Sequence, residues 1–253
     1  MIQSSKSVKY GFNIWWDSDD SFVGKVVAED NYEPFESDLF LNFILPDSVV
    51  IDVGANIGYY SLLAAKKLDA KRGGVLFAFE PEQRNFELLE KNIDLNRVET
   101  VVPMNQAIAL ENGSMDLFLS KTNKGDHQLY FSPERERQTV KTVSLDGFIH
   151  ERSIHPTVLK VDTQGYDFLI LKSAAKYIQS VEHLVLFTEF WDYGNRHADL
   201  NSKEYFDFLQ DSFKEVLYID EEKQKTYPVD FDFMLKVCEK YNNYGHGNLL
   251  CIK

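Results

Sequence analysis

Residues 49–65 read VVIDVGANIGYYSLLAA and join a short apolar run, a glycine-containing turn and a stretch of helical composition. The apolar run predicts a buried strand, and the turn passes through Asp52, Gly54, Asn56 and Gly58. A strand, a glycine turn and a helix N-terminus together form a place where the backbone can approach a small ligand. This stretch therefore predicts an α/β fold with a ligand site at the end of its strand.

Strands and helices alternate along the chain on both sides of this stretch. Near-continuous apolar strands separated by amphipathic helices indicate a parallel sheet that is covered on both faces. The expected strands are residues 49–53, 75–79, 100–103, 158–161, 184–187, 215–219 and 248–252. The expected helices are residues 36–44, 59–68, 83–96, 145–150, 166–178 and 203–212.

Two regions depart from this alternation. Residues 10–16 and 22–27 flank an acidic turn and predict a small N-terminal β-hairpin. Short apolar pieces at 115–119, 129–131 and 139–143 predict an inserted β segment. We expect one domain over residues 1–253, with the hairpin and first helix in 1–45 and the core in 46–253.

Composition and charge exclude several classes of partner. The 253 residues carry a formal net charge of -13, which repels phosphate backbones, so we expect no nucleic acid partner. Neither a signal-peptide pattern nor an apolar run of the ~18 residues needed for a membrane span is present. Cys238 and Cys251 lack metal-site spacing, and so few cysteines suit a reducing compartment. We therefore expect a cytoplasmic protein; its oligomeric state has no sequence signal.

The glycine turn is compatible with three ligand classes that require different residues. A P-loop ends in Gly-Lys-Ser/Thr to hold phosphates and Mg²⁺, and that ending is absent. A dinucleotide fingerprint needs G-x-G-x-x-G, whereas this turn has only Gly54 and Gly58. The third class, S-adenosylmethionine, carries no phosphate. It needs a loop that clears its amino-acid end and ribose, and an acid after the second strand.

Glu80 supplies this acid, because it directly follows the apolar run 76–79. A carboxylate at the end of a strand can accept hydrogen bonds from both ribose hydroxyls. Dinucleotide enzymes use an equivalent acid, so Glu80 alone does not decide between the two cofactors. Asn105, Gln106 and Ala107 give the third strand a polar end near the expected adenine. The combination favours the methyl donor.

Several segments resemble the FkbM-type methyltransferases. They are YEPFE (32–36), IDVGANIGYYS (51–61), FEP (79–81), VSLD (143–146) and LKVDTQG (159–165). The resemblance implies a Rossmann-like seven-stranded methyltransferase sheet and transfer of a methyl group from S-adenosylmethionine. The usual acceptor in that family is a hydroxyl of a sugar or a secondary metabolite. Family members more often have an acid where Gln164 stands, so we assign Gln164 no catalytic role.

The candidate cofactor-binding residues follow from these positions. We expect Asp52 near the methionine end, with Gly54, Asn56 and Gly58 where the loop backbone meets the ligand, and Glu80 on the ribose. The structural alternative for each is a residue that only shapes a turn.

Further candidates lie beyond the third strand. Asn105, Gln106 and Ala107 are expected on the adenine side, or else cap the strand. Asp126 is expected beside the cofactor if the polar loop 122–128 covers the site.

Three side chains are candidate proton acceptors. His127 lies in the polar loop and has a near-neutral pKa in its unperturbed form, although it could equally be an exposed loop histidine. Asp162 and Glu189 each end a core strand and should face the transferred methyl group. These three side chains could instead bind a divalent metal ion, but no segment has ligand spacing, so we expect no metal.

The expected activity is O-methylation of a hydroxyl on a small molecule or glycan, with the acceptor oxygen aligned ~3 Å behind the methyl group. Trp191 and Tyr193 follow Glu189 and could stack on a sugar ring, or pack beneath a lid. The sequence leaves open an N-methyltransferase of the same fold, an NAD-dependent enzyme and a non-catalytic nucleotide-binding module.

Overall fold

An eight-stranded mixed sheet lies at the centre of the computed structural model, which describes residues 1–7, 9–20, 23–240 and 244–253. Neighbouring strands from β10 to β5 are parallel, whereas β13 pairs antiparallel with both β10 and β11. The strands, in spatial order, are β12 (Lys225–Pro228), β11 (Glu215–Asp220), β13 (Gly247–Ile252), β10 (Val185–Phe190), β9 (Val158–Val161), β3 (Val49–Val53), β4 (Val75–Phe79) and β5 (Val101–Met104).

The expected seven-stranded sheet is present, with β12 added as an eighth strand at one edge. β12 pairs antiparallel with β11 through a tight turn and contains Pro228, which cannot donate to a strand ladder and is tolerated at an edge. Its short, polar sequence KTYP gives no strand signal, which explains why the pattern did not predict it.

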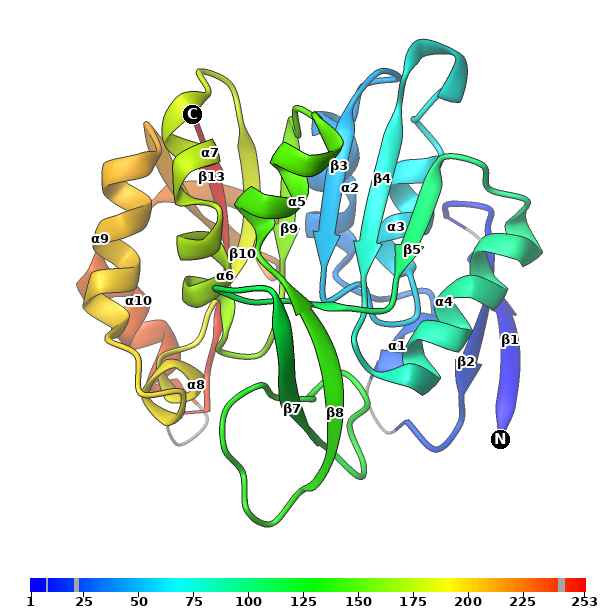
Figure 1. Cartoon of the computed structure of the whole chain (residues 1–253), viewed down its shortest axis with the longest axis horizontal. Coiled ribbons are helices and arrows are strands. Elements are labelled where there is room, and N and C mark those ends of the chain that lie inside the picture. Colours follow the sequence, from blue (N-terminus) through cyan, green and yellow to red (C-terminus); the bar gives the residue numbers. More distant parts are fainter. Residues whose placement is uncertain (8, 21–22, 241–243) are drawn as a thin grey trace.

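Helices cover both faces of the sheet (Figure 1). Successive side chains of each central strand point to opposite faces, and in β3 Val50 packs in one apolar cluster and Ile51 in the other. The Val50 side holds α2 (Pro34–Phe43), α3 (Tyr59–Ala65) and α4 (Gln83–Asn96). The Ile51 side holds α5 (Leu145–Arg152), α6 (Asp167–Ser173), α7 (Ala175–Ser180), α9 (Ser202–Ser212) and α10 (Phe231–Cys238).

Some predicted boundaries change. The single helix expected over 166–178 is two helices, α6 and α7, which meet at Ala174. The short elements η1 (Ala70–Arg72) and α8 (Asp192–His197) were not predicted, and α8 begins directly after the end of β10.

The N-terminal hairpin is present, but its predicted strands are wrong. β1 (Ile2–Lys6) pairs antiparallel with β2 (Asn13–Asp17), whereas the predicted second strand 22–27 is largely a helix, α1 (Val23–Ala28). Val23 and Val27 are both buried and lie one helical turn apart, a spacing that the β-branched composition concealed. The predicted strand's first residue, Phe22, lies outside the described residues.

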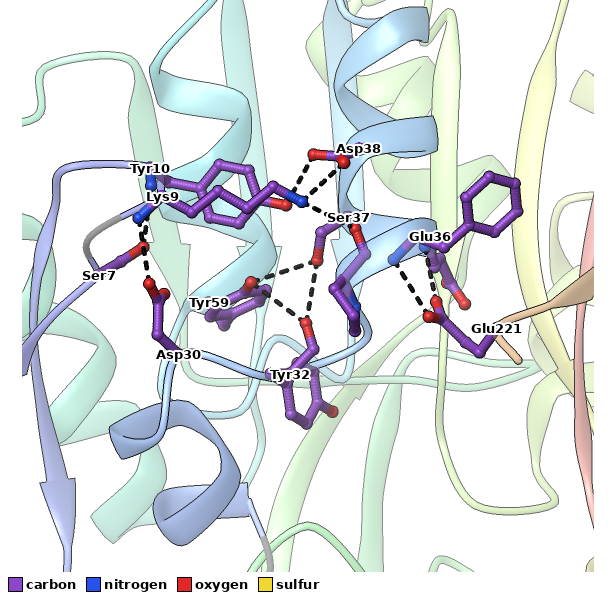
Figure 2. Close-up of polar contacts among 12 residues, drawn as sticks. Ser7, Lys9, Tyr10, Asp30, Tyr32, Glu36, Ser37, Asp38, Tyr59 and Glu221 are labelled. Carbon is purple, nitrogen blue, oxygen red and sulfur yellow. Dashed lines mark hydrogen bonds and ion pairs between the residues drawn. The ribbon is translucent and has the colours of Figure 1, made fainter. Parts of the chain in front are cut away.

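A polar network ties the N-terminal segment to the helices beneath it (Figure 2). The hydroxyls of Ser37 on α2 and Tyr59 on α3 lie 3.2 Å apart, and each lies 3.2 Å from the carbonyl oxygen of Tyr32, which accepts a hydrogen bond from them. Tyr10 donates to Asp38 at 2.9 Å. Since α3 begins at the glycine turn, these bonds fix the helix that follows the ligand loop.

The inserted β segment is a separate three-stranded sheet that lies beyond the carboxyl ends of β3 and β4 (Figure 1). It contains β6 (Ala107–Ile108), β7 (Gly113–Leu119) and β8 (Glu136–Val143). The predicted strand 129–131 is wrong: only Gln128 pairs, through one bridge to Phe118. β8 occupies the ladder of β7, so Tyr130 is buried by side-chain packing instead.

Candidate active site

A cleft opens where β3, β4 and β5 end, and we call it the cofactor cleft. Its wall contains Gly54 and Asn56 after β3, Glu80 after β4, and Gln106 and Ala107 after β5. These residues come from three consecutive strand ends because parallel strands direct their carboxyl ends to one edge. The structure thus brings five of the predicted cofactor residues together.

Glu80 is the buried acid of the cofactor cleft, with 5% of its surface exposed. Its carboxylate accepts the backbone N–H of Asn56 at 2.9 Å and that of Glu82 at 2.8 Å. Burial raises the pKa of Glu80 to about 8, although both hydrogen bonds oppose that rise. Each oxygen retains a lone pair, so a ligand with hydroxyl donors would stabilise the ionised form.

Neighbouring residues of the protein, and not only a ligand, require glycine at positions 54 and 58. Both have positive φ, at +82° and +91°. A Cβ on Gly54 would overlap the carbonyl oxygen of Asp162, and one on Gly58 would lie 2.6 Å from a methyl group of Leu89 on α4. Gly58 is not among the residues that line the cleft, and its contact with α4 by itself requires a glycine; ligand approach at Gly58 stays a prediction.

Two predicted cofactor residues lie behind the cleft wall. Asp52 is 2% exposed and accepts a hydrogen bond of 2.7 Å from the hydroxyl of Ser61 on α3. Asn105 donates to the carbonyl of Glu80 at 3.0 Å and to that of Pro81 at 3.3 Å. Both side chains therefore shape the loops that carry cleft residues, and ligand contact by either stays a prediction.

The loop after β7 covers the cofactor cleft. The backbone of Lys124 holds it in place, which no sequence pattern predicted. The carbonyl of Lys124 accepts hydrogen bonds from Asn85 on α4 at 2.9 Å and from Asn56 at 3.5 Å. The N–H of Lys124 donates to Asp20 of the N-terminal segment at 3.2 Å. Asn85, Lys124 and Gly125 all line the cleft, so the insertion closes it from outside.

His127 lines the cofactor cleft from the same loop. Its Nδ1 accepts the backbone N–H of Ser120 at 3.0 Å, so the proton of the neutral ring is on Nε2. Burial, with Lys124 and Arg135 nearby, lowers its pKa to about 4. Nε2 is buried without a hydrogen-bond partner among the described residues. His127 is therefore arranged to donate a hydrogen bond at neutral pH rather than to accept a proton.

Asp162 lines the cleft beside Gly54 and is held in its ionised form. It pairs with Lys160 at 3.1 Å, and Gln164 donates to it at 3.2 Å. The Lys160 ammonium holds its pKa below the usual value despite burial. Lys160 is 4% exposed and also lies in the field of Asp52 and Glu36. A lone lysine in an otherwise apolar strand was the sequence signal for this buried charge.

A second pocket adjoins the cofactor cleft, and Gln164 lines both. We call it the aromatic pocket, because Tyr130, Trp191, Tyr193 and Tyr244 form much of its wall. The rings of Tyr193 and Tyr244 lie 4.6 Å apart between centroids. Its polar lining includes Asp126, Arg135, Glu189, His197 and His246.

Asp126 and Glu189 line the aromatic pocket rather than the cofactor cleft. Asp126 pairs with Arg135 at 2.7 Å and accepts from Gln128 at 2.8 Å. Glu189 is 5% exposed and pairs with Nδ1 of His246 at 2.7 Å. No sequence pattern could identify this partner of His246, because 57 positions of chain separate His246 from the strand end that it meets.

In the described part of the chain, no group of three or more His, Cys, Asp and Glu side chains is arranged to hold a metal ion. In the same residues, no helix combines the length and the apolar character needed to cross a bilayer.

The strand order, the acid at the end of β4 and the covered cleft define a Rossmann-like α/β protein with a ligand site at its strand ends. The chain belongs to the family of the methyltransferase FkbM domain, whose model matches residues 52–239. It is 30% identical over 142 residues to the hexuronic acid methyltransferase AglP of Haloferax volcanii. That alignment spans 55% of this chain and 55% of AglP.

Solved structures support the fold. A Streptococcus mutans protein described as a methyltransferase, in complex with SAH, has a TM-score of 0.50 at 10% identity and covers 87% of this chain and 96% of its own. The structure of aTrm5 with tRNALeu has a TM-score of 0.51 at 12% identity, over 99% of this chain and 52% of that one. At such identities the likeness shows the fold alone.

Proposed function

We propose that the protein transfers the methyl group of S-adenosylmethionine to a hydroxyl of a sugar. The observation that carries this proposal is the junction at Gln164, where a cleft with a ribose-type acid meets a pocket with aromatic walls. Membership of a methyltransferase family and the SAH bound to a protein of the same fold support the choice of cofactor. The aromatic pocket, in a chain of net charge -13, favours a sugar over a nucleic acid.

The residues of the cofactor cleft fit this cofactor. Glu80 would accept hydrogen bonds from the ribose hydroxyls, and Gln106 and Ala107 would lie beside the adenine. The orphaned Nε2–H of His127 would donate to a polar group of the ligand. Asp162, ionised beside Gly54, would attract the positive end of the ligand. When bound, the cofactor supplies a methyl group already activated on a sulfonium.

The aromatic pocket fits a sugar that carries an acidic group. Tyr193 and Trp191 offer ring faces to the apolar face of a sugar, and Arg135 is a cation at the same wall. Hexuronic acids, the substrates in the name of AglP, are therefore the first candidates. The protein's own task in transfer is to align the acceptor oxygen with the methyl group and to remove its proton.

The proposal is tested by binding and transfer with the intact protein. Calorimetry with S-adenosylmethionine, SAH and NAD should show binding of the first two. Methyl transfer is then measured from radiolabelled S-adenosylmethionine to paired acceptors: glycosides of hexuronic acids and of the matching neutral hexoses. Labelled methyl ether on a sugar is the expected product. Binding of NAD alone contradicts the cofactor, and absence of label from every glycoside contradicts the sugar hydroxyl.

A further inference from the structure

We propose that Nε2 of His246 removes the proton from the acceptor hydroxyl. Glu189 orients this imidazole and stabilises the positive charge that it gains. The inference rests on the proposed function and specifies which of its side chains acts as the base. Glu189 is then a positioning residue, and the base is a histidine that the pattern of strand ends does not predict.

The sheet places Glu189 and His246 side by side. Glu189 lies near the end of β10, and β13 pairs antiparallel with it in the register Glu189 to Asn248. His246 precedes β13 directly, so the sheet itself brings the two side chains together, with Oε1 and Nδ1 2.7 Å apart. A carboxylate at Nδ1 fixes the proton there, so the neutral ring has its lone pair on Nε2.

The carboxylate of Glu189 has His246 as its one hydrogen-bond partner among the described residues. Glu189 is 5% exposed, and its Oε2 has no hydrogen-bond partner among the described residues. A buried carboxylate with one unpaired oxygen is costly unless a cation forms beside it. The imidazolium of His246 is that cation, which is the arrangement required of a base and its orienting acid.

His246 lies in the aromatic pocket, which adjoins the cofactor cleft. Its side chain is half-exposed, at 54%, and lines the aromatic pocket together with Gln164, which also lines the cofactor cleft. The pair therefore stands where an acceptor in the aromatic pocket would face the methyl group. The negative field of Asp162, which lines the cofactor cleft, reaches His246.

The other two candidate bases are less suited to the task. His127 presents an N–H at the cofactor cleft, because its Nδ1 is occupied by Ser120. Asp162 is paired with Lys160 and accepts from Gln164, which lowers its pKa and weakens it as a base. Of His127, Asp162 and His246, only His246 combines an orienting carboxylate with a basic nitrogen that has no hydrogen-bond partner among the described residues.

The step balances in atoms and charge. A lone pair of the acceptor oxygen forms the new O–CH₃ bond, and the electron pair of the breaking C–S bond stays on sulfur. The hydroxyl proton moves to Nε2 of His246, and Glu189 neutralises the resulting imidazolium. The ether and the neutral thioether leave, and the proton then passes to solvent from the half-exposed ring.

The charges around His246 fix the sign of its pH dependence. Glu189, followed by Asp162 and Glu33, raises its pKa to about 9. His246 lines the aromatic pocket and also a further pocket between β11 and α10. The other charged groups in these two pockets are Asp126, Glu134, Arg135, Asp220, Glu221, Glu222, Lys223, Lys236 and Lys240. Because the neutral ring is the base, kcat/KM should rise with pH up to a limb near 9. Removing the Glu189 charge should move that limb to lower pH.

The test compares pH profiles of kcat/KM for the wild type, Glu189→Gln and His246→Gln, with the sugar acceptor that shows the highest turnover. We expect the limb to shift down by at least one pH unit in Glu189→Gln and to disappear in His246→Gln, with kcat lowered about 100-fold. Glu189→Asp should restore part of the limb. His183→Gln, at an exposed histidine before β10, is the control.

A second measurement needs no acceptor. The ¹⁵N signals of His246 report its pKa and its neutral tautomer in the wild type and in Glu189→Gln. We expect the Nδ1–H tautomer in the wild type and a lower pKa in the variant. An unshifted pKa, or an Nε2–H tautomer in the wild type, overturns the base. If sugars are methylated and the limb is unmoved in Glu189→Gln, the base is wrong while the function stands; if no sugar is methylated, the function fails instead.

Discussion

The cofactor cleft and the aromatic pocket adjoin at Gln164 but are built in different ways. The geometry of the cleft comes from neighbouring strand ends: Gly54, Glu80 and Gln106 each lie within three residues of one. The aromatic pocket is assembled from the insertion, the segment after β10 and the loop before β13. The first design fixes one ligand through backbone geometry, whereas the second can change acceptor by changing loops.

The largest expected effect comes from breaking the backbone geometry of the cofactor cleft. Gly54→Ala places a Cβ on the carbonyl oxygen of Asp162 at a position where φ is +82°. Neighbouring strands must separate, so we expect a loss of about 3–5 kcal/mol in the free energy of unfolding, from overpacking and backbone strain together. Denaturant titration of the two proteins measures this loss.

Gly73→Ala is the matched control for Gly54→Ala. Gly73 also has a positive φ, at +89°, but a Cβ there would meet no atom within 4 Å. It should therefore lose only the conformational term, about 1 kcal/mol. Equal losses at the two glycines would show that contact with the end of β9 does not limit the loop.

The second effect concerns the acid of the cofactor cleft. Glu80→Gln removes the charge that would accept two ribose hydroxyls, so affinity for S-adenosylmethionine should fall about 100-fold. Calorimetry at pH 8 measures the change. Unchanged affinity would remove Glu80 from the cofactor site.

The same substitution has a signature in stability. Burial raises the pKa of Glu80 from an ordinary 4.5 to about 8, so the folded protein retains this proton when the unfolded chain has lost it. The ligand-free wild type therefore loses stability as pH rises between these two values, and Glu80→Gln does not. The altered hydrogen bonds of Glu80→Gln shift its melting temperature by the same amount at every pH. The difference in melting temperature, variant minus wild type, should therefore increase from pH 5 to pH 9.

The same contrast governs how much the sequence could predict. The bounds of β3, β4, β9 and α4 follow from apolar runs and helical spacing, because both report burial of neighbouring residues. α1 was missed because its valines favour a strand locally, while burial in the tertiary structure makes it a helix.

The site follows the same rule. Glu80 could be placed because it directly follows an apolar strand. His246 and Asn85 could not, because their partners lie on other segments of the chain and single-sequence patterns carry no such pairing. Their roles depend on long-range packing, which becomes visible only in the folded structure.

The third effect tests the aromatic pocket separately. Tyr193→Ala removes a ring that packs against Tyr244 and His197 at the pocket wall. A stacked ring contributes about 1 kcal/mol, so KM for the sugar acceptor should rise about 5- to 10-fold. The dissociation constant of S-adenosylmethionine should stay unchanged, since Tyr193 does not line the cofactor cleft. A matching loss of cofactor affinity would mean that the two sites are one.

The smallest effect concerns the charge of the acceptor. Arg135→Gln removes the cation of the aromatic pocket, whose pairing with Asp126 leaves it 19% exposed. Since Asp126 already neutralises part of its charge, KM for hexuronic acid glycosides should rise only about 3-fold, and KM for neutral hexosides should not change. Arg137→Gln is the matched control, because Arg137 pairs with Asp116 on the exterior of the insertion and is 73% exposed. If both variants affect both acceptors equally, the charge acts through the stability of the insertion, and Arg135 does not select an acidic sugar.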